Sequence, residues 1–118
     1  MPKVAIILLA ANDTPEGTGR MANALTTALE FQEAGDEVQL MFDGAGVTWI
    51  PRLTDAEEKY SRLFERVRPV VAGACLYCAR AYGVKDAVEE ADVPFVSDFK
   101  DHPSVRGLVT GGFQVITF

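Results

Sequence analysis

The order in which apolar segments alternate with helical patterns is the feature that most restricts the fold of this chain. Residues 4–9 (VAIILL) are continuously apolar and rich in branched side chains, which is typical of a strand buried on both faces of a parallel sheet. Further short apolar segments lie at residues 38–42, 70–74, 95–96 and 113–118. A helical pattern separates each neighbouring pair, which predicts right-handed strand–helix–strand units. We therefore expect an α/β fold, a three-layer sandwich with a mostly parallel sheet of about five strands.

Turn and capping residues predict where the intervening helices begin and end. We expect a polar loop over residues 12–19, then a helix that Gly35 terminates. An irregular loop is expected at residues 44–52, where Trp49 belongs either to the core or to a subunit interface. Thr54 begins a capping-box pattern, so the next helix is predicted to start there. Further helices are expected at residues 76–82, 84–91 and 103–110.

Length and charge limit the domain count and the classes of partner. The chain has 118 residues and is 48% hydrophobic, which fits one compact domain over residues 1–118. Its formal net charge is −6, with 17 acidic against 11 basic side chains. Such an acidic surface is a poor match for nucleic acid or for anionic membrane. We expect a small-molecule or protein partner instead.

The apolar segments are too short for a membrane span. The longest run, residues 4–11, has eight residues against the roughly 20 that a bilayer requires. Only Lys3 precedes this run, and no clear cleavage site follows it, so we expect no signal peptide. The expected location is the cytoplasm, where thiols are kept reduced. Two cysteines in such a chain are expected to be chemical or buried residues rather than a structural disulfide.

Polar residues follow the predicted strands at the points where chemistry gathers in parallel sheets. Ligands of such folds bind outside the carboxyl ends of the strands. Asn12, Asp43, Cys75, and Ser97 or Asp98 come next to those ends. Cys75 is the strong nucleophile of this group. Asn12, Asp43 and Asp98 are predicted to be ligand-binding residues.

The segment GACLYCAR holds both cysteines, Cys75 and Cys78, directly after the third predicted strand. Cys75 is expected at the cap of the next helix, where free N–H groups and the helix dipole stabilise a thiolate. We therefore expect a lowered pKa and a catalytic sulfur at Cys75; the alternative is an inert, buried cysteine. Cys78 is either a second catalytic thiol, able to form a disulfide with Cys75, or a small buried residue. Arg80 either adds positive charge here or faces solvent.

Neither a metal nor a cofactor is expected from the residue inventory. Structural zinc takes four ligands, and the chain offers Cys75, Cys78 and one histidine, His102. A fourth ligand would have to be a carboxylate or come from another subunit, so no metal is predicted. His102 is either a base for Cys75 or an ordinary residue at a helix start. The G-x-G pattern at Gly17 lacks a P-loop lysine and matches a dinucleotide loop only weakly.

The chain resembles the DsrE/DsrF-like family over nearly its whole length. The resemblance rests on the buried first strand, the polar loop into a helix, the FDG turn ending at Gly44, and above all VVAGACLYCARAYGV, with Cys75 eight residues before Gly83. It implies a small α/β fold, homo- or hetero-oligomers such as trimers or hexamers, and sulfur-relay activity. The family's relay cysteine follows the third strand, which corresponds to Cys75. Cys78 is not part of the minimal relay pattern, so thiol–disulfide chemistry stays open.

Three functions follow as hypotheses. The first is a sulfur carrier or sulfurtransferase that accepts sulfane sulfur as a persulfide on Cys75 and exchanges it with donor and acceptor proteins or a small-molecule persulfide. The second is a redox-active or redox-sensing protein that cycles Cys75 and Cys78. The third is a non-enzymatic oligomer that binds a small ligand at the strand ends.

Overall fold

The computed structural model describes residues 1–118 and contains one sheet of five strands, all parallel. The strands are β1 (Lys3–Leu8), β2 (Glu37–Phe42), β3 (Val71–Cys75), β4 (Phe95–Val96) and β5 (Gln114–Thr117). They lie in the order β4-β3-β2-β1-β5, so the chain runs outward from β1 to β4 and returns to the far side of β1 with β5. The predicted α/β sandwich is confirmed, and its sheet is parallel throughout.

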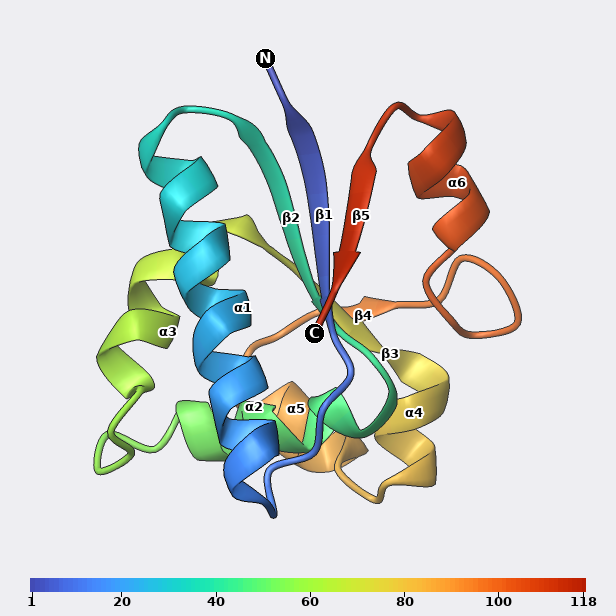
Figure 1. Ribbon diagram of the computed structural model, residues 1–118. Coiled ribbons are helices and arrows are strands. Elements are labelled where there is room, and N and C mark those ends of the chain that lie inside the picture. The colour runs from blue at the N-terminus through green and yellow to red at the C-terminus, as the bar shows by residue number, and fades with distance from the viewer.

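Helices cover both faces of the sheet, but unequally. The long helix α1 (Pro15–Glu33) and α3 (Ser61–Val67) lie on one face, and α6 (Val105–Thr110) lies on the other (Figure 1). The shorter elements are η1 (Gly44–Thr48), α2 (Trp49–Leu53), η2 (Arg68–Val70), α4 (Leu76–Ala81) and α5 (Lys85–Glu90). In Figure 1, α2, α4 and α5 gather beyond the carboxyl ends of the strands. No helix is both long enough and apolar enough to cross a bilayer.

Strand β1 is buried on both faces and connects two apolar clusters. Val4, Ile6 and Leu8 belong to the larger cluster, which also contains the buried side chains of α1 and α3. Ala5 and Ile7 belong to a smaller cluster with a buried leucine of α6. Each fully buried aliphatic side chain contributes about 1.5–3 kcal/mol. The continuous apolar run of the sequence is therefore explained by two-sided burial.

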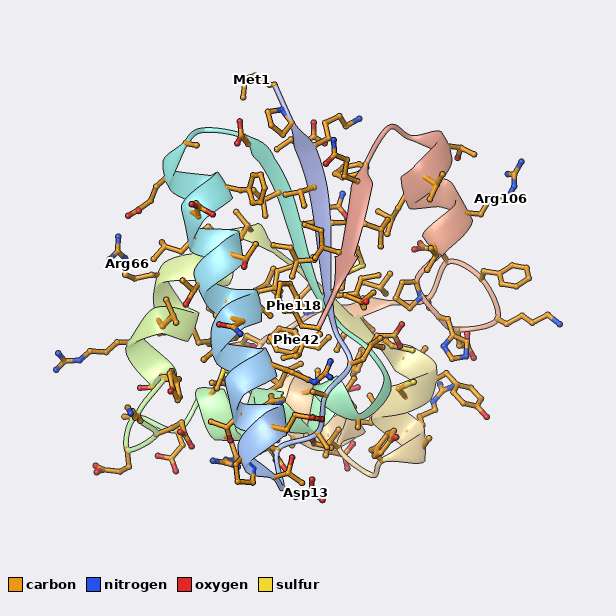
Figure 2. All side chains as sticks on the ribbon, viewed as in Figure 1. Met1, Asp13, Phe42, Arg66, Arg106 and Phe118 are labelled. Carbon is orange, nitrogen blue, oxygen red and sulfur yellow. The ribbon has the colours of Figure 1, made fainter.

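Aromatic side chains fill the larger cluster. The rings of Phe42 and Phe64 meet edge to face with their centroids 6.1 Å apart. Trp49 is fully buried, and its indole N–H donates to the carbonyl of Ala10 at 3.0 Å, so it is a core residue of the single chain. Figure 2 shows Phe42 in the interior, whereas Arg66 points outward from α3.

Helix α1 begins earlier than the sequence predicts. The expected loop over residues 12–19 is replaced by a helix from Pro15 onward. The Thr14 side chain accepts a hydrogen bond from the Gly17 amide at 2.9 Å, and Pro15 occupies a first-turn position where no N–H is needed. Gly35 follows the helix with a φ of 78°, as predicted for a terminating glycine.

The segment after α2 also differs from the prediction. Thr54 does not cap a helix start, because its hydroxyl donates back to the Ile50 carbonyl at 2.9 Å and closes the end of α2. Residues 54–60 form turns, and the next helix, α3, starts at Ser61. Residues 44–52, which we expected to be irregular, form η1 and most of α2.

We predict that Gly73→Ala destabilises the protein. Gly73 has a φ of 149°, and a Cβ there would lie 2.5 Å from the Pro94 carbonyl oxygen and 2.9 Å from Val96 Cγ2. Because β4 cannot move away without weakening its pairing with β3, we expect the free energy of unfolding to fall by about 2 kcal/mol or more. Urea denaturation measures this change.

Gly19→Ala is the matched control for this prediction. Gly19 lies inside α1, and a Cβ there would meet no atom within 4 Å. Alanine favours a helix interior over glycine by about 0.5–1 kcal/mol, so this variant should be as stable as the wild type or more so. Equal stability of the two variants would contradict the steric account of β3.

Candidate functional site

Three neighbouring strands bring chemically active side chains to one edge of the sheet. Asp43 directly follows β2, Cys75 is the last residue of β3, and His102 belongs to the loop after β4. Since the strands are parallel, their carboxyl ends meet at this edge. Helix α4 adds Cys78 from its first turn, and the loop after β4 passes beside α4 (Figure 1). We refer to Asp43, Cys75, Cys78 and His102 as the thiol cluster.

Cys75 caps helix α4, as the sequence predicts. Its backbone has φ −58° and ψ 121°, and its side chain accepts a hydrogen bond from the Cys78 amide, with the nitrogen 3.4 Å from Sγ. Both cysteines are free and buried: Cys75 has no exposed surface, and Cys78 is 9% exposed. The strand and the helix therefore fix both sulfur atoms relative to each other.

A tight turn holds His102 over the cysteines. Phe99 and His102 exchange two backbone hydrogen bonds, at 2.9 and 2.8 Å, around Lys100 and Asp101. These two central residues have φ values of 50° and 65°, as in a type I′ turn, although neither is glycine. Left-handed backbone costs such residues roughly 1–2 kcal/mol each, so other contacts must stabilise the turn. One of them is the Tyr77 amide, which donates to the Asp101 carbonyl at 2.9 Å.

The side chains of the thiol cluster are in direct contact. His102 Nδ1 lies 3.2 Å from Cys75 Sγ, and the Tyr77 ring packs against the imidazole, with centroids 4.7 Å apart and the two planes tilted by 34°. The Cys78 thiol donates to Asp43 Oδ1 at 3.5 Å. The four potential ligand atoms all lie within 4.8 Å of one another. This arrangement can support thiol chemistry assisted by a base, and its residue types can also bind a transition metal.

The expected lowering of the Cys75 pKa is wrong. Burial raises the pKa of this thiol to about 12; the Cys78 amide opposes the change, and the Asp43 carboxylate adds to it. Burial likewise raises the pKa of Cys78. Desolvation thus outweighs the helix start on which the prediction was based. Arg80 adds no contact to either sulfur, because it pairs with Asp101 at 3.4 Å on the surface.

The other two residues predicted to bind a ligand lie outside the thiol cluster. Asn12 Nδ2 donates to the Thr48 carbonyl at 3.0 Å and thereby ties the loop after β1 to η1. Asp98 accepts a hydrogen bond from the Ser104 amide at 3.4 Å and lines a cavity of about 390 Å³ that also touches β2, β3 and α6. A binding role for Asn12 and Asp98 stays a prediction.

The glycine pattern after β1 has a packing explanation. Gly17 lies in the first turn of α1, and a Cβ there would be 2.0 Å from the Ala11 carbonyl oxygen. The missing side chain lets the preceding loop pass close to the helix. This steric requirement accounts for the glycine without a nucleotide.

Two contacts of the site cannot be read from the sequence. The sequence offers His102, the chain's one histidine, as a base for Cys75 or as an ordinary helix-start residue, and the structure shows its contact with Cys75. The contact between Asp43 and Cys78 was not anticipated either. It depends on β2 and β3 being neighbours in the sheet, which the order of elements along the chain does not state.

Comparisons with known proteins support the fold but do not indicate a function. No protein-family model matches the chain. The chain is 28% identical over 96 residues to the uncharacterized protein MJ0733 of Methanocaldococcus jannaschii, a match that covers 81% of this chain and 78% of that protein. A solved structure, the conserved protein of unknown function BT1422 from Bacteroides thetaiotaomicron, is similar with a TM-score of 0.65 and 13% identity over 97% of this chain and 94% of the other. This solved protein therefore shares the fold, and the function has to be inferred from the thiol cluster.

We predict that Cys75 reacts slowly with iodoacetamide near neutral pH. A raised pKa keeps the sulfur protonated, and burial restricts access, so the folded protein should react well below the rate of the same chain in urea. A Cys78→Ala background isolates Cys75, and mass spectrometry follows the adduct. Alkylation of the folded chain as fast as that of the unfolded chain would contradict the buried-thiol description.

The same pKa shift predicts a loss of stability in alkali. The folded pKa of Cys75 lies above the ordinary value of 9.0, so its contribution to stability is complete below that value. It is lost as the pH rises from about 9 towards about 12, because only the unfolded chain then releases the proton. Thermal unfolding should therefore show a larger alkaline decrease in Tm for the wild type than for Cys75→Ala. Parallel curves would contradict the assignment to Cys75.

Proposed function

We propose that the protein is a thiol-based sulfur carrier in which Cys75 accepts sulfane sulfur as a persulfide. The observation that carries this proposal is the 3.2 Å contact between Cys75 Sγ and His102 Nδ1. An imidazole at this distance can take the thiol proton during attack, which offsets the unfavourable ionisation of a buried sulfur. The thiol then stays protonated until a donor is present.

The loading step is one exchange between a thiol and a persulfide. Cys75 Sγ attacks the outer sulfur of a donor R–S–SH while His102 takes the Cys75 proton. The bond between the two donor sulfurs breaks as the new S–S bond forms. R–S⁻ leaves and takes the proton from His102 as a thiol, so that Cys75 carries the persulfide.

The sulfur can leave by two routes that differ in the role of Cys78. In the first, an acceptor thiol attacks the outer sulfur and regenerates the Cys75 thiol. In the second, Cys78 attacks Cys75 Sγ, hydrosulfide leaves, and a Cys75–Cys78 disulfide forms. An external thiol reductant then restores the pair, which requires a reducing compartment such as the cytoplasm.

The DsrE/DsrF-like resemblance supports the proposal, because that family's relay cysteine follows the third strand, as Cys75 does here. It also supports protein donors and acceptors and a homo-oligomer such as a trimer or hexamer. Two exposed aromatic side chains adjoin His102: Tyr77 is 55% exposed and Phe99 63%. A hollow of about 650 Å³ touches Phe99, His102 and the start of α6. A partner that docks on these side chains would reach the turn that covers Cys75.

A dithiol redox function is the second candidate, and one observation favours it. The Cys75 and Cys78 sulfurs lie within 4.8 Å of each other, so little movement is needed to join them. Here both thiols lose their protons and electrons to a small disulfide oxidant, and no sulfur atom is carried. Mass spectrometry after equilibration in defined thiol–disulfide buffers measures this pair. If both thiols stay reduced in an oxidising buffer, the dithiol redox function is excluded.

We predict that the protein gains one sulfur atom when it is incubated with a small-molecule persulfide. Intact mass should increase by that atom in the wild type and not in Cys75→Ser. The persulfide should persist longer in Cys78→Ser, because hydrosulfide release through the second thiol is blocked. His102→Gln should load at least 10-fold more slowly, since general-base assistance typically contributes 10²–10⁴-fold.

Asp86→Asn serves as the control, because it changes an exposed carboxylate of α5 that lies outside the thiol cluster. This variant should load as the wild type does. Equal sulfur uptake by Cys75→Ser, or no uptake by the folded wild type, would exclude the carrier function. Equal loading rates for His102→Gln and the wild type would exclude His102 as the base.

A further inference from the structure

We propose that the thiol cluster is a zinc site with four protein ligands, namely Cys75, Cys78, His102 and Asp43. The proposal goes beyond sulfur transfer and does not depend on it. It rests on four side chains that converge at the edge of the sheet from two strand ends, the loop after β4 and the first turn of a helix. No other residue type is needed to complete the set.

The ligand set matches the chemistry of zinc. Thiolate, imidazole and carboxylate are the three side-chain ligands that zinc takes, and structural sites hold it with four of them. The spacing of Cys75 and Cys78, with two residues between them, is also the usual spacing of paired zinc thiolates. From the sequence, the fourth ligand would have to be a carboxylate or come from another subunit. The structure brings a carboxylate, that of Asp43, into contact with Cys78 at 3.5 Å.

The distances are close to those of a tetrahedral site. Zinc bonds of about 2.0–2.3 Å place neighbouring ligand atoms roughly 3.3–3.8 Å apart. The Cys75–His102 contact is 3.2 Å, the Cys78–Asp43 contact is 3.5 Å, and no pair of ligand atoms exceeds 4.8 Å. The largest separation therefore needs to shrink by about 1 Å, which small side-chain rotations supply.

Contacts with groups other than the four ligand atoms orient three of the four side chains. The Cys78 amide donates to Cys75 Sγ at 3.4 Å, and such N–H groups stabilise a metal-bound thiolate. Asp43 Oδ1 accepts a hydrogen bond from the Gly44 amide at 2.8 Å, and the Tyr77 ring stacks on the imidazole of His102. These partners fix the ligand orientations before a metal arrives. That preorganisation favours binding.

Binding would convert both cysteines into metal thiolates. Each thiol gives its proton to solvent, the Asp43 carboxylate and the neutral imidazole keep their forms, and the ion bonds to two sulfurs, one nitrogen and one oxygen. Four protein ligands leave no open position for water or substrate. A bound zinc ion would therefore block Cys75 Sγ, so this sulfur could not hold a zinc ion and a persulfide at the same time.

Metal binding can be tested on the full chain, reduced and stripped with EDTA. We expect one equivalent of Zn²⁺ to bind in competition with a chromophoric chelator. Co²⁺ as a probe should give a sulfur-to-metal charge-transfer band and the intense visible bands of a tetrahedral site. Mg²⁺ should not compete, because it requires octahedral oxygen ligands. Absence of stoichiometric binding, or a cobalt spectrum without the sulfur band, would overturn the proposal.

Matched variants test the individual ligands. Asp43→Asn keeps a side-chain oxygen that can accept the hydrogen bond from the Gly44 amide, so the variant should still fold. Its zinc affinity should fall about 10-fold or more, because even changes to residues that only contact a metal ligand lower metal affinity about 10–100-fold. Asp86→Asn makes the same change outside the cluster, on the exposed side of α5, and should bind as the wild type does. Equal affinities for the two variants would overturn Asp43 as a ligand. Full affinity in the Cys75→Ser/Cys78→Ser double variant would overturn the site itself.

Thermal unfolding with and without Zn²⁺ separates lost binding from lost structure. A folded variant that no longer binds should show an apo transition without the zinc-dependent increase in Tm that we expect for the wild type. The sulfur-loading test is run with EDTA present, so the two proposals fail independently. A chain that binds zinc but takes up no sulfur supports this inference alone.

Discussion

The burial of β1 on both faces is the constraint from which the rest of the architecture follows. A strand without a polar face needs cover above and below the sheet, and here α1 and α3 supply one layer and α6 the other. Helices that connect neighbouring strands across such a sheet keep those strands parallel. Parallel strands in turn deliver all their carboxyl ends to one edge. Asp43, Cys75 and His102 thus lie close together because the packing of a short apolar segment near the start of the chain requires a parallel sheet.

Two opposing effects meet at Cys75. Burial disfavours the thiolate strongly enough to raise its pKa to about 12, although the sulfur caps a helix and accepts the Cys78 amide. The imidazole of His102 sits where the proton of a reacting sulfur would go, and a metal ion would displace the same proton. Under the two proposals, the buried thiol would lose its proton only when a sulfur donor or a metal ion arrives. The four side chains of the thiol cluster are already close together while both thiols are free.

Much of the fold was predictable from the sequence, because two-sided strand burial leaves a periodic signal. The strands, the cap at Cys75 and the termination at Gly35 all follow from local residue chemistry. The start of α1 and the role of Thr54 were predicted wrongly, since a threonine can cap the helix that follows it or close the one before. The thiol cluster itself depends on strand adjacency and on the left-handed turn at Lys100. Neither property is written in a short stretch of sequence.

His102 differs from its three neighbours in how it is attached. The two cysteines and Asp43 lie at strand ends or in the first turn of α4. His102 lies instead on a tight turn. This turn contacts α4 through the Tyr77 amide, the Tyr77 ring and the Arg80–Asp101 ion pair. A local opening that breaks those few contacts would move the imidazole away from Cys75 and leave the sheet intact. Such a local opening would expose the sulfur without global unfolding.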